Sequence, residues 1–309
     1  MRRTLLLLPL LAVACATPES AIHAARLSGR VTPELSRLCT DFRVANPGYD
    51  LAWLPGVREV TAAEQPRVAF VQEGRASAVL HSSGRAIDAG EPALASGDVA
   101  LLRPGERLTL DAPLGLLVFT LPGQLPPELP GFVRPDHDPR ITDTPGGCAE
   151  EDDAYRRILL TWLEEVGPYQ LHTLNAHRVR INDSFSHYHP VEGGFDELYL
   201  VQEAPAGARL LTSESTERIL DPASVARSEA SNLLQARELA VGDLVYLPRG
   251  TVHRGLGGAV VQVITVPGFR PGAEVGVDHH LKAINELLGL EDDEVLPYRA
   301  GSADEAVIR

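Results

Sequence analysis

Short apolar-rich runs separated by turn residues dominate two regions of the chain. The first region extends from Arg67 to Thr120 and includes RVAFVQEG and LGLLVFTLP. The second extends from Gln170 to Pro267 and includes DELYLVQEA and AVVQVITVP. Runs of this length, bounded by turn residues, are typical of strands in an antiparallel barrel or sandwich. The pattern therefore predicts an all-β fold class with two β-rich regions in tandem.

Three segments outside these regions are expected to be helical. The first covers Pro33 to Val44. The second covers Asp152–Val166, where leucine and tryptophan side chains recur at helical spacing. The third covers Val277–Leu288 and is stopped at Gly289, a residue type that commonly ends helices. The two β-rich regions also share a phrase, GDVALLRPGE at 97–106 and GDLVYLPRGT at 242–251, which predicts an internal repeat.

The first residues of the chain resemble an export signal. Arg2 and Arg3 precede ten apolar residues, Leu5 to Ala14, whereas a bilayer-spanning helix needs about 20. Small residues before Cys15 resemble a bacterial lipobox, in which that cysteine is lipidated and becomes the mature N-terminus. The alternative is plain secretion with Cys15 removed. Either way we expect an exported protein, anchored to the membrane by a lipid alone or soluble in the periplasm.

Export changes how the two remaining cysteines are interpreted. Cys39 and Cys148 form an even pair in an oxidising compartment. A disulfide between them would close a loop of about 110 residues and tie the N-terminal segment to the linker. Two free, buried thiols are the alternative.

The charge balance narrows the choice of partners. With 28 basic and 42 acidic residues the net charge is −14. A phosphate backbone would repel such a chain, and we see no basic stripe that would reverse this locally. We therefore expect no nucleic-acid partner, and we expect a small-molecule substrate or ligand, with homo-oligomer formation left open.

Three histidines and one glutamate form a candidate metal site. His187 and His189 are separated by one residue, so on a strand both imidazoles point to the same face. Glu197 opens the next strand-like run, DELYLV, and His253 follows the turn-rich PRGTVH. Three imidazole nitrogens and one carboxylate suit one divalent Fe, Mn, Ni, Co or Zn ion, with one or two positions open for water or substrate.

These residues resemble the two motifs of the cupin family. The family's first motif is G-x5-H-x-H-x3/4-E-x6-G, in which His187, His189 and Glu197 match the ligands. The second is G-x5-P-x-G-x2-H-x3-N. It is matched at every spacing up to its histidine by Gly242, Pro248, Gly250 and His253. Seven residues, PVEGGFD, separate His189 from Glu197 instead of three or four. They are expected to form a long hairpin loop, and Glu192 within that loop is the alternative ligand.

The resemblance implies a bicupin with one intact metal site. In the first β-rich region Leu108 stands where the ligand histidine would be, so that barrel is expected to bind no metal. The metal barrel would belong to a metal-dependent enzyme of dioxygenase or isomerase type acting on a small organic substrate. A non-catalytic periplasmic lipoprotein that binds a small molecule or metal is the alternative.

The expected divisions follow from the motifs and the elements together. They are a signal peptide (1–14), an N-terminal segment with one helix (15–60), a degenerate metal-free barrel (61–125), a linker with a helix (126–166), a metal-binding barrel (167–270), and a C-terminal helix and tail (271–309).

Overall fold

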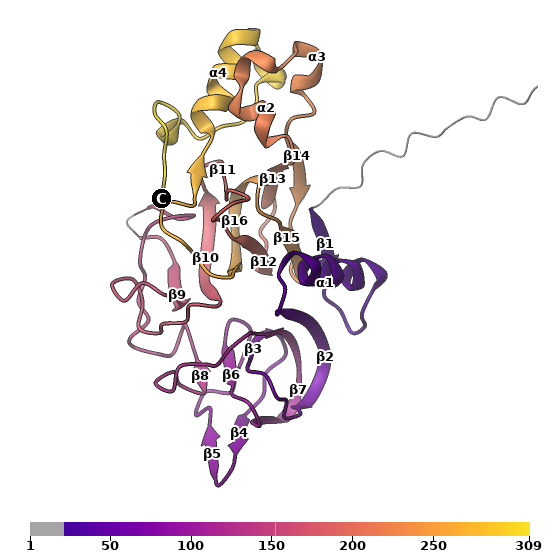
Figure 1. The fold of residues 1–309 in the computed structure, drawn as a ribbon, viewed down its shortest axis with the longest axis vertical. Coiled ribbons are helices and arrows are strands. Elements are labelled where there is room, and N and C mark those ends of the chain that lie inside the picture. The colour runs from indigo at the N-terminus through magenta and orange to yellow at the C-terminus, as the bar shows by residue number, and fades with distance from the viewer. Residues whose placement is uncertain (1–21, 152) are drawn as a thin grey trace, which may run out of the picture.

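The computed structural model describes residues 22–151 and 153–309. Within these residues the chain is mainly β and forms two curled sheets, one above the other along the long axis of the molecule (Figure 1). The predicted all-β class with two tandem β-rich regions is confirmed. The expected signal peptide and lipidation site Cys15 lie outside the described residues. In the described part of the chain, no helix has the length and apolar character needed to cross a membrane.

The first sheet has seven strands in the described chain and encloses an apolar interior. Its main path is β5-β4-β7-β3-β6-β8, with β2 paired to β7. The strands are β2 (Asp50–Val60), β3 (Arg67–Glu73), β4 (Ala78–Ser82), β5 (Arg85–Asp88), β6 (Val99–Leu102), β7 (Arg107–Thr120) and β8 (Phe132–Val133). The sheet thus begins at Asp50, ahead of the boundary expected at residue 61.

The second sheet has ten strands among the described residues, on a main path β1-β15-β12-β16-β10-β9. The strands are β1 (His23–Arg26), β9 (Arg156–Leu160), β10 (Asn175–Asp183), β11 (His187–Tyr188), β12 (Asp196–Glu203), β13 (Arg209–Ser213), β14 (Gln235–Glu238), β15 (Asp243–Leu247), β16 (Val252–Val266) and β17 (Val275–Gly276). β1 pairs with β15, and Arg26 forms an ion pair with Asp243, 217 residues later. The described part of the chain therefore starts in the second sheet, forms the first, and returns to the second.

Two of the three predicted helices are confirmed as α1 (Pro33–Ala45) and α4 (Asp278–Leu288). Thr32 caps α1, since its side-chain oxygen accepts a hydrogen bond from the backbone N–H of Leu35. Gly289 ends α4 in the left-handed conformation that glycine adopts without strain. Shorter helices pack with α4 beyond one end of the second sheet (Figure 1). They are α2 (Thr216–Leu220), α3 (Arg227–Ala230) and the 3₁₀ turns η1 (Pro222–Ser224), η2 (Asp292–Glu294) and η3 (Ala300–Ser302).

The helix predicted over Asp152–Val166 is wrong. Residues Arg156–Leu160 form β9, which pairs antiparallel with β10. Ile158, Leu159 and Leu160 are all buried, so both faces of this strand are covered. A short apolar run of this kind also matches helical spacing, and periodicity alone does not separate the two structures.

The predicted disulfide is also wrong, because Cys39 and Cys148 are both free and buried. Cys39 lies on α1 in the apolar cluster between the sheets, whereas Cys148 belongs to the cluster enclosed by the second sheet. An even number of cysteines permits a bond but does not bring two thiols within bonding distance. Burial raises the pKa of Cys39 to about 11, so this thiol is protonated and unreactive at neutral pH.

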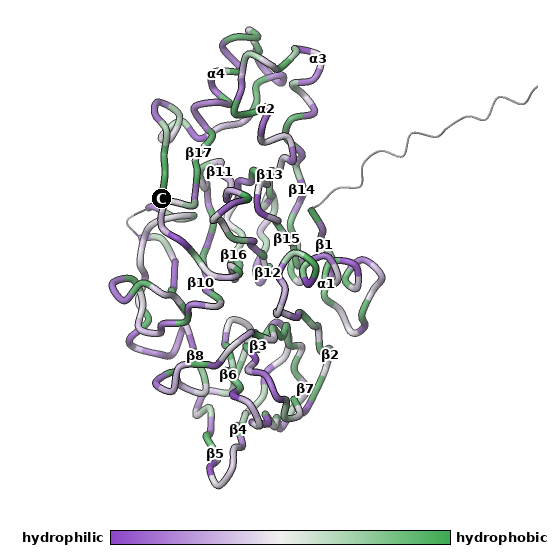
Figure 2. The backbone as a smooth tube through the Cα atoms, viewed as in Figure 1, coloured by the Kyte–Doolittle hydropathy of each residue, from purple (hydrophilic) through white to green (hydrophobic). Residues whose placement is uncertain are grey.

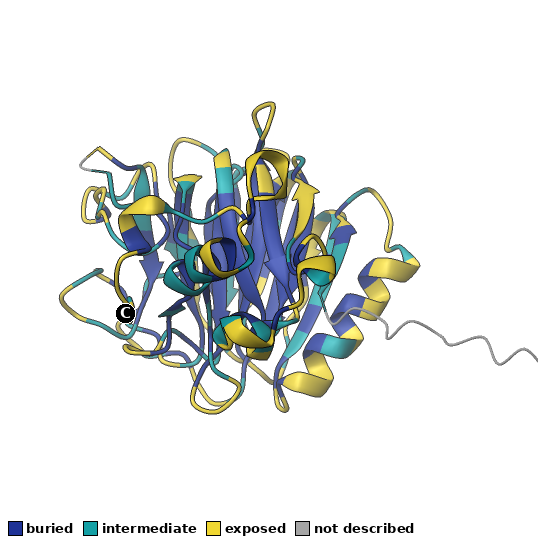
Figure 3. Cartoon of the chain, turned by 90° about the horizontal axis from the view of Figure 1, so that it is seen from above, coloured by how far each residue is buried: buried dark blue, intermediate teal, exposed yellow. Residues whose placement is uncertain are grey.

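The cluster between the sheets joins α1 to both of them. Phe42 on α1 meets Phe119 of β7 and Tyr246 of β15 edge to face, with ring centroids 5.7 and 5.9 Å apart. Figure 2 shows apolar positions concentrated on the strands, and Figure 3 shows the strands buried behind exposed outer faces of the helices. The two sheets therefore share one core, with α1 packed against both.

Candidate metal centre

Three histidines meet inside the second sheet. His187 on β11 pairs directly with His253 on β16, and His189 follows just beyond β11. One ring nitrogen from each lies within 4.8 Å of those from the other two, and all three side chains are buried. The structure thus brings together the histidines that the two sequence motifs singled out.

Backbone carbonyl groups fix how these rings present their nitrogens. The Nδ1 atoms of His187 and His253 each lie 3.1 Å from a carbonyl oxygen, that of Phe185 and that of Thr251. A carbonyl can only accept, so each Nδ1 carries the hydrogen, and in the neutral ring Nε2 keeps its lone pair. The Nε2 atoms of all three histidines are buried and have no hydrogen-bond partner. When all three rings are neutral, their Nε2 lone pairs are therefore available to a ligand held between them.

Glu197 is positioned beside the imidazoles by the alternation of β12. Its side chain is only 2% exposed. Its Oε1 atom lies 3.3 Å from His253 Nε2, and its Oε2 atom lies 3.7 Å from His189 Nε2. Its neighbour Leu198 points the other way, into the cluster between the sheets. The carboxylate therefore completes a four-donor arrangement with the three rings.

The alternative acidic residues lie elsewhere. Asp196 is buried on the opposite face of β12, where it accepts hydrogen bonds from Asn46, Tyr246 and Arg249. Glu192 is exposed in the loop after His189. That loop is not the predicted hairpin, because β11 and β12 lie on opposite sides of β16. The seven residues between His189 and Glu197 carry the chain across from one side of β16 to the other.

Burial and the nearby carboxylate shift the histidine pKa values in different directions. Burial, reinforced by neighbouring histidines, lowers the pKa of His187 and that of His189 well below the ordinary value, so both rings are neutral. Burial also opposes the charged form of His253, but the contact with Glu197 outweighs it and raises the pKa. Glu197 therefore favours the protonated form of the His253 ring in the metal-free protein.

These donors fit a divalent transition metal. Three imidazole nitrogens and one carboxylate oxygen accommodate Fe, Mn, Co, Ni or Zn. The rings of Phe185 and Phe195 lie against His187 and His189, with centroids 4.4 and 3.9 Å apart. These aromatic neighbours restrict ring rotation and keep water out, which favours a defined ligand geometry.

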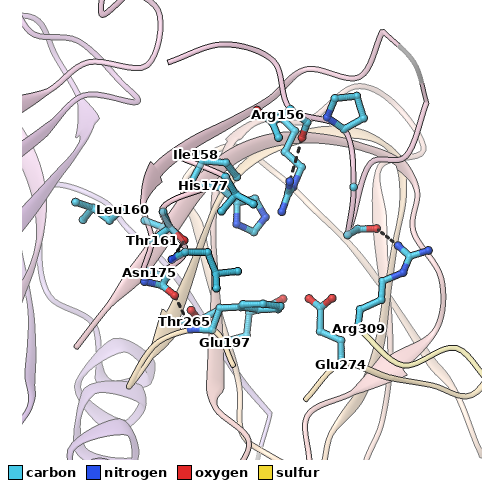
Figure 4. Close-up of a pocket in the computed structure, with 18 residues that line it drawn as sticks. Arg156, Ile158, Leu160, Thr161, Asn175, His177, Glu197, Thr265, Glu274 and Arg309 are labelled. Carbon is cyan, nitrogen blue, oxygen red and sulfur yellow. Dashed lines mark hydrogen bonds between the residues drawn. The ribbon is translucent and has the colours of Figure 1, made fainter. Parts of the chain in front are cut away.

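A cavity of about 280 Å³ adjoins this centre, and Glu197 forms part of its wall (Figure 4). Polar side chains of Arg156, His177, Glu274 and Arg309 also line it. Sequence reasoning missed these four residues, because they come from β9, β10, the segment before β17 and the last described position. Only His177 could have been found from the sequence, because strand alternation places it on the same inward face of β10 as Val179 and Ile181.

The first sheet offers no comparable arrangement in the part of the chain that the structure describes. Leu108 is buried among aliphatic side chains. His81 hydrogen-bonds to the Thr109 hydroxyl at 2.8 Å. The three-histidine group of the second sheet is the one cluster of its kind in residues 22–151 and 153–309.

Comparisons with known proteins give distant structural similarity. No protein-family model matches the sequence, and no curated protein is similar enough to match. Among solved structures, an oxalate decarboxylase from Bacillus subtilis studied for its Mn(II) centres is 13% identical, with 93% of this chain and 84% of that chain covered and a TM-score of 0.49. The same enzyme at pH 4.6 is 13% identical, with 93% of this chain and 83% of that chain covered and a TM-score of 0.48. An oxalate decarboxylase studied for substrate binding and reaction specificity is 14% identical, with 80% of this chain and 74% of that chain covered and a TM-score of 0.44. Likeness this distant does not bear on the substrate of the present chain.

In the metal-free protein, Glu274→Gln is expected to stabilise the fold above neutral pH. Burial, and next the charge of Glu197, raises the pKa of Glu274 from 4.5 to about 7. The folded state thus holds this proton more tightly than the unfolded state, and the resulting stability is lost as the pH rises through about 7. The uncharged glutamine should reduce the fall in unfolding free energy between about pH 5 and 8 by about 1–3 kcal/mol.

Urea unfolding of the chelator-treated protein at both pH values measures this effect. Glu192→Gln is the matched control, because it makes the same replacement at an exposed position. An identical pH dependence in wild type and Glu274→Gln would contradict the expectation.

Proposed function

We propose that this chain is an exported, metal-dependent bicupin enzyme, of dioxygenase or isomerase type, that acts on a small organic substrate. The observation that carries the proposal is the meeting of three unpartnered imidazole nitrogens with a carboxylate that also lines a cavity. Structural metal sites are closed by four protein ligands and packed on all sides. A donor set that borders a cavity instead leaves room for a small molecule beside the metal.

Each residue of the proposed site has a defined task. The Nε2 atoms of His187, His189 and His253 would hold the metal together with the carboxylate of Glu197. A bound divalent metal would supply polarisation of a substrate oxygen or activation of dioxygen. The backbone carbonyls behind the rings keep the lone pairs directed inward, and Phe185 and Phe195 exclude water from that side.

Metal analysis joined to a turnover assay tests this function. We would measure the metal content of the protein isolated from its own compartment, then oxygen consumption and product formation with a panel of phenols and organic acids. Turnover that disappears on chelation and returns with metal would support an enzyme. One metal per chain without turnover of any panel member would favour the non-catalytic binding protein, and absence of metal would overturn the metal-dependent enzyme.

The same isolation tests the expected location. Mass spectrometry of the mature N-terminus separates a lipid-modified Cys15 from a plain cleavage product. A chain that retains residues 1–14 in the cytoplasm would overturn the proposed export.

A further inference from the structure

The cavity beside the proposed metal site has two chemically different sides. In Figure 4, Leu160 lies on one side, Glu274 and Arg309 lie on the other, and the side chains of Arg156 and His177 extend between them. Further apolar side chains line the cavity, namely Leu163, Val166 and Phe269. A molecule that fits this space must therefore combine a polar end with an apolar body.

Arg156 is the lining group that most requires a partner. Its Nη1 atom donates a hydrogen bond to the Thr144 carbonyl at 3.0 Å, but its Nε atom is buried and has none. It forms no ion pair with any of the described residues, whereas the other arginine of the cavity, Arg309, pairs with Glu150. Burial of the Arg156 guanidinium opposes its charge and lowers its pKa. The nearby Glu274 carboxyl favours the charged form of Arg156, but near neutral pH part of the Glu274 population is uncharged, so an anion in the cavity would further stabilise the guanidinium.

Two more lining residues carry buried polar atoms without partners. They are the Nε2 atom of His177 and the Oγ1 atom of Thr265. Folded proteins leave few buried polar atoms unsatisfied, and such atoms are not expected to collect around one cavity by chance. Together with Arg156 they indicate a ligand that offers both hydrogen-bond acceptors and a negative charge.

We propose that this cavity binds a small monocarboxylate with an apolar body, such as an aromatic or branched aliphatic acid. The carboxylate would pair with the Arg156 guanidinium, the geometry that arginine forms most strongly. The apolar body would pack against Leu160 and Phe269. The inference rests on the proposed function in that this acid would be the substrate, although binding itself requires only the cavity.

The volume of the cavity limits the size of the acid. A cavity of about 150 Å³ holds one benzene molecule, and the present cavity is about 280 Å³. One ring and a carboxylate therefore fit, whereas a fused-ring acid with long substituents does not. A small dicarboxylate such as oxalate would leave the apolar side in contact with water and forgo that part of the binding free energy.

The acidic residues of the cavity oppose a second negative charge. Glu197 lies next to the imidazoles, and Glu274 lies on the same side as Arg309. Burial raises the pKa of Glu274 to about 7, so near neutral pH part of the population carries an uncharged carboxyl that can donate a hydrogen bond. One carboxylate is thus accommodated, and a dianion is disfavoured.

Isothermal titration calorimetry with benzoate, benzamide and oxalate tests the proposal on the full chain, both metal-loaded and metal-free. In the metal-free protein, benzoate should bind at least about tenfold more tightly than benzamide, which has the same shape without the charge. Arg156→Gln should abolish this preference. Arg157→Gln is the matched control on the same strand, because Arg157 pairs with Asp143 outside the cavity and its loss should leave the preference intact.

Several outcomes would overturn the proposal. Equal affinity for benzoate and benzamide would show that Arg156 does not recognise the negative charge of the ligand. Tighter binding of oxalate than of benzoate would show that the ligand needs no apolar body. The comparison of ligands needs no variant, and Arg156→Lys, which keeps the charge, covers the case in which Arg156→Gln does not fold. Benzoate binding by a protein that takes up no metal when metal is supplied would leave this inference standing and contradict the proposed function; metal uptake without benzoate binding would do the reverse.

Discussion

Replacing His187 and His253 together with alanine is expected to lower bound metal from about one ion per chain to background. The two imidazoles supply half of the proposed donors, and even residues that only orient metal ligands change affinity by about 10–100-fold. A pair of isolated donors, His189 and Glu197, does not hold a first-row metal tightly. Elemental analysis after dialysis against a weak chelator gives the ratio of metal to protein.

Two controls separate the metal site from general effects of losing charge or a ring. Glu192→Gln removes the alternative carboxylate, and His280→Ala removes a histidine on α4 that is not part of the three-histidine cluster. Both should retain about one metal ion per chain. His253→Gln keeps the size of the side chain and serves if the double variant misfolds, which circular dichroism would detect. Unchanged occupancy in folded His187→Ala/His253→Ala protein would show that the metal is held elsewhere.

Replacing Phe42 with alanine is expected to destabilise the protein by about 3–5 kcal/mol. Phe42 is fully buried where α1 meets Phe119 of the first sheet and Tyr246 of the second. Its removal leaves a cavity in the core that both sheets share, and α1 cannot close it without losing other contacts. Urea denaturation followed by circular dichroism measures the change.

Val44→Ala is the matched control for this substitution. Val44 lies on the same helix but is 76% exposed, so its truncation should change the unfolding free energy by less than about 0.5 kcal/mol. A similar decrease in unfolding free energy for Phe42→Ala and Val44→Ala would mean that helix propensity, and not the shared core, determines the effect. A loss below about 1 kcal/mol for Phe42→Ala would show that the two sheets are stable independently of α1.

The parts of the site that sequence could predict are those fixed by local spacing. The turn PRGTVH and the pair HYH predict where the three imidazoles lie on their strands, and the cupin resemblance singled out Glu197, with Glu192 as the alternative. In the structure Glu197 lies beside the imidazoles, whereas Asp196 faces the opposite side of β12. Such features depend on residues within a few positions of one another.

The features that sequence could not predict depend on segments far apart in the chain. Arg156 on β9 and Glu274 in the segment before β17 approach the cavity from parts of the chain whose placement only the whole sheet determines. The run Arg156–Leu160 matches helical spacing, and its pairing with β10 decides that it is a strand. The disulfide prediction was wrong because it also depended on segments far apart in the chain. An even number of cysteines contains no information about the distance between Cys39 and Cys148.

The pairing of β1 with β15 has a consequence for the order in which the protein folds. β1 leaves the ribosome before any residue of the first sheet, but its partner strand is synthesised 217 residues later. The first sheet can acquire its own pairings as soon as residue 133 has emerged, while β1 still has no neighbour. The second sheet therefore closes only after almost the whole chain is present, and the edge of β15 is covered last. A protein that begins after Arg26, and so lacks β1, would keep every proposed metal donor but expose that edge to other chains, so aggregation is its expected failure.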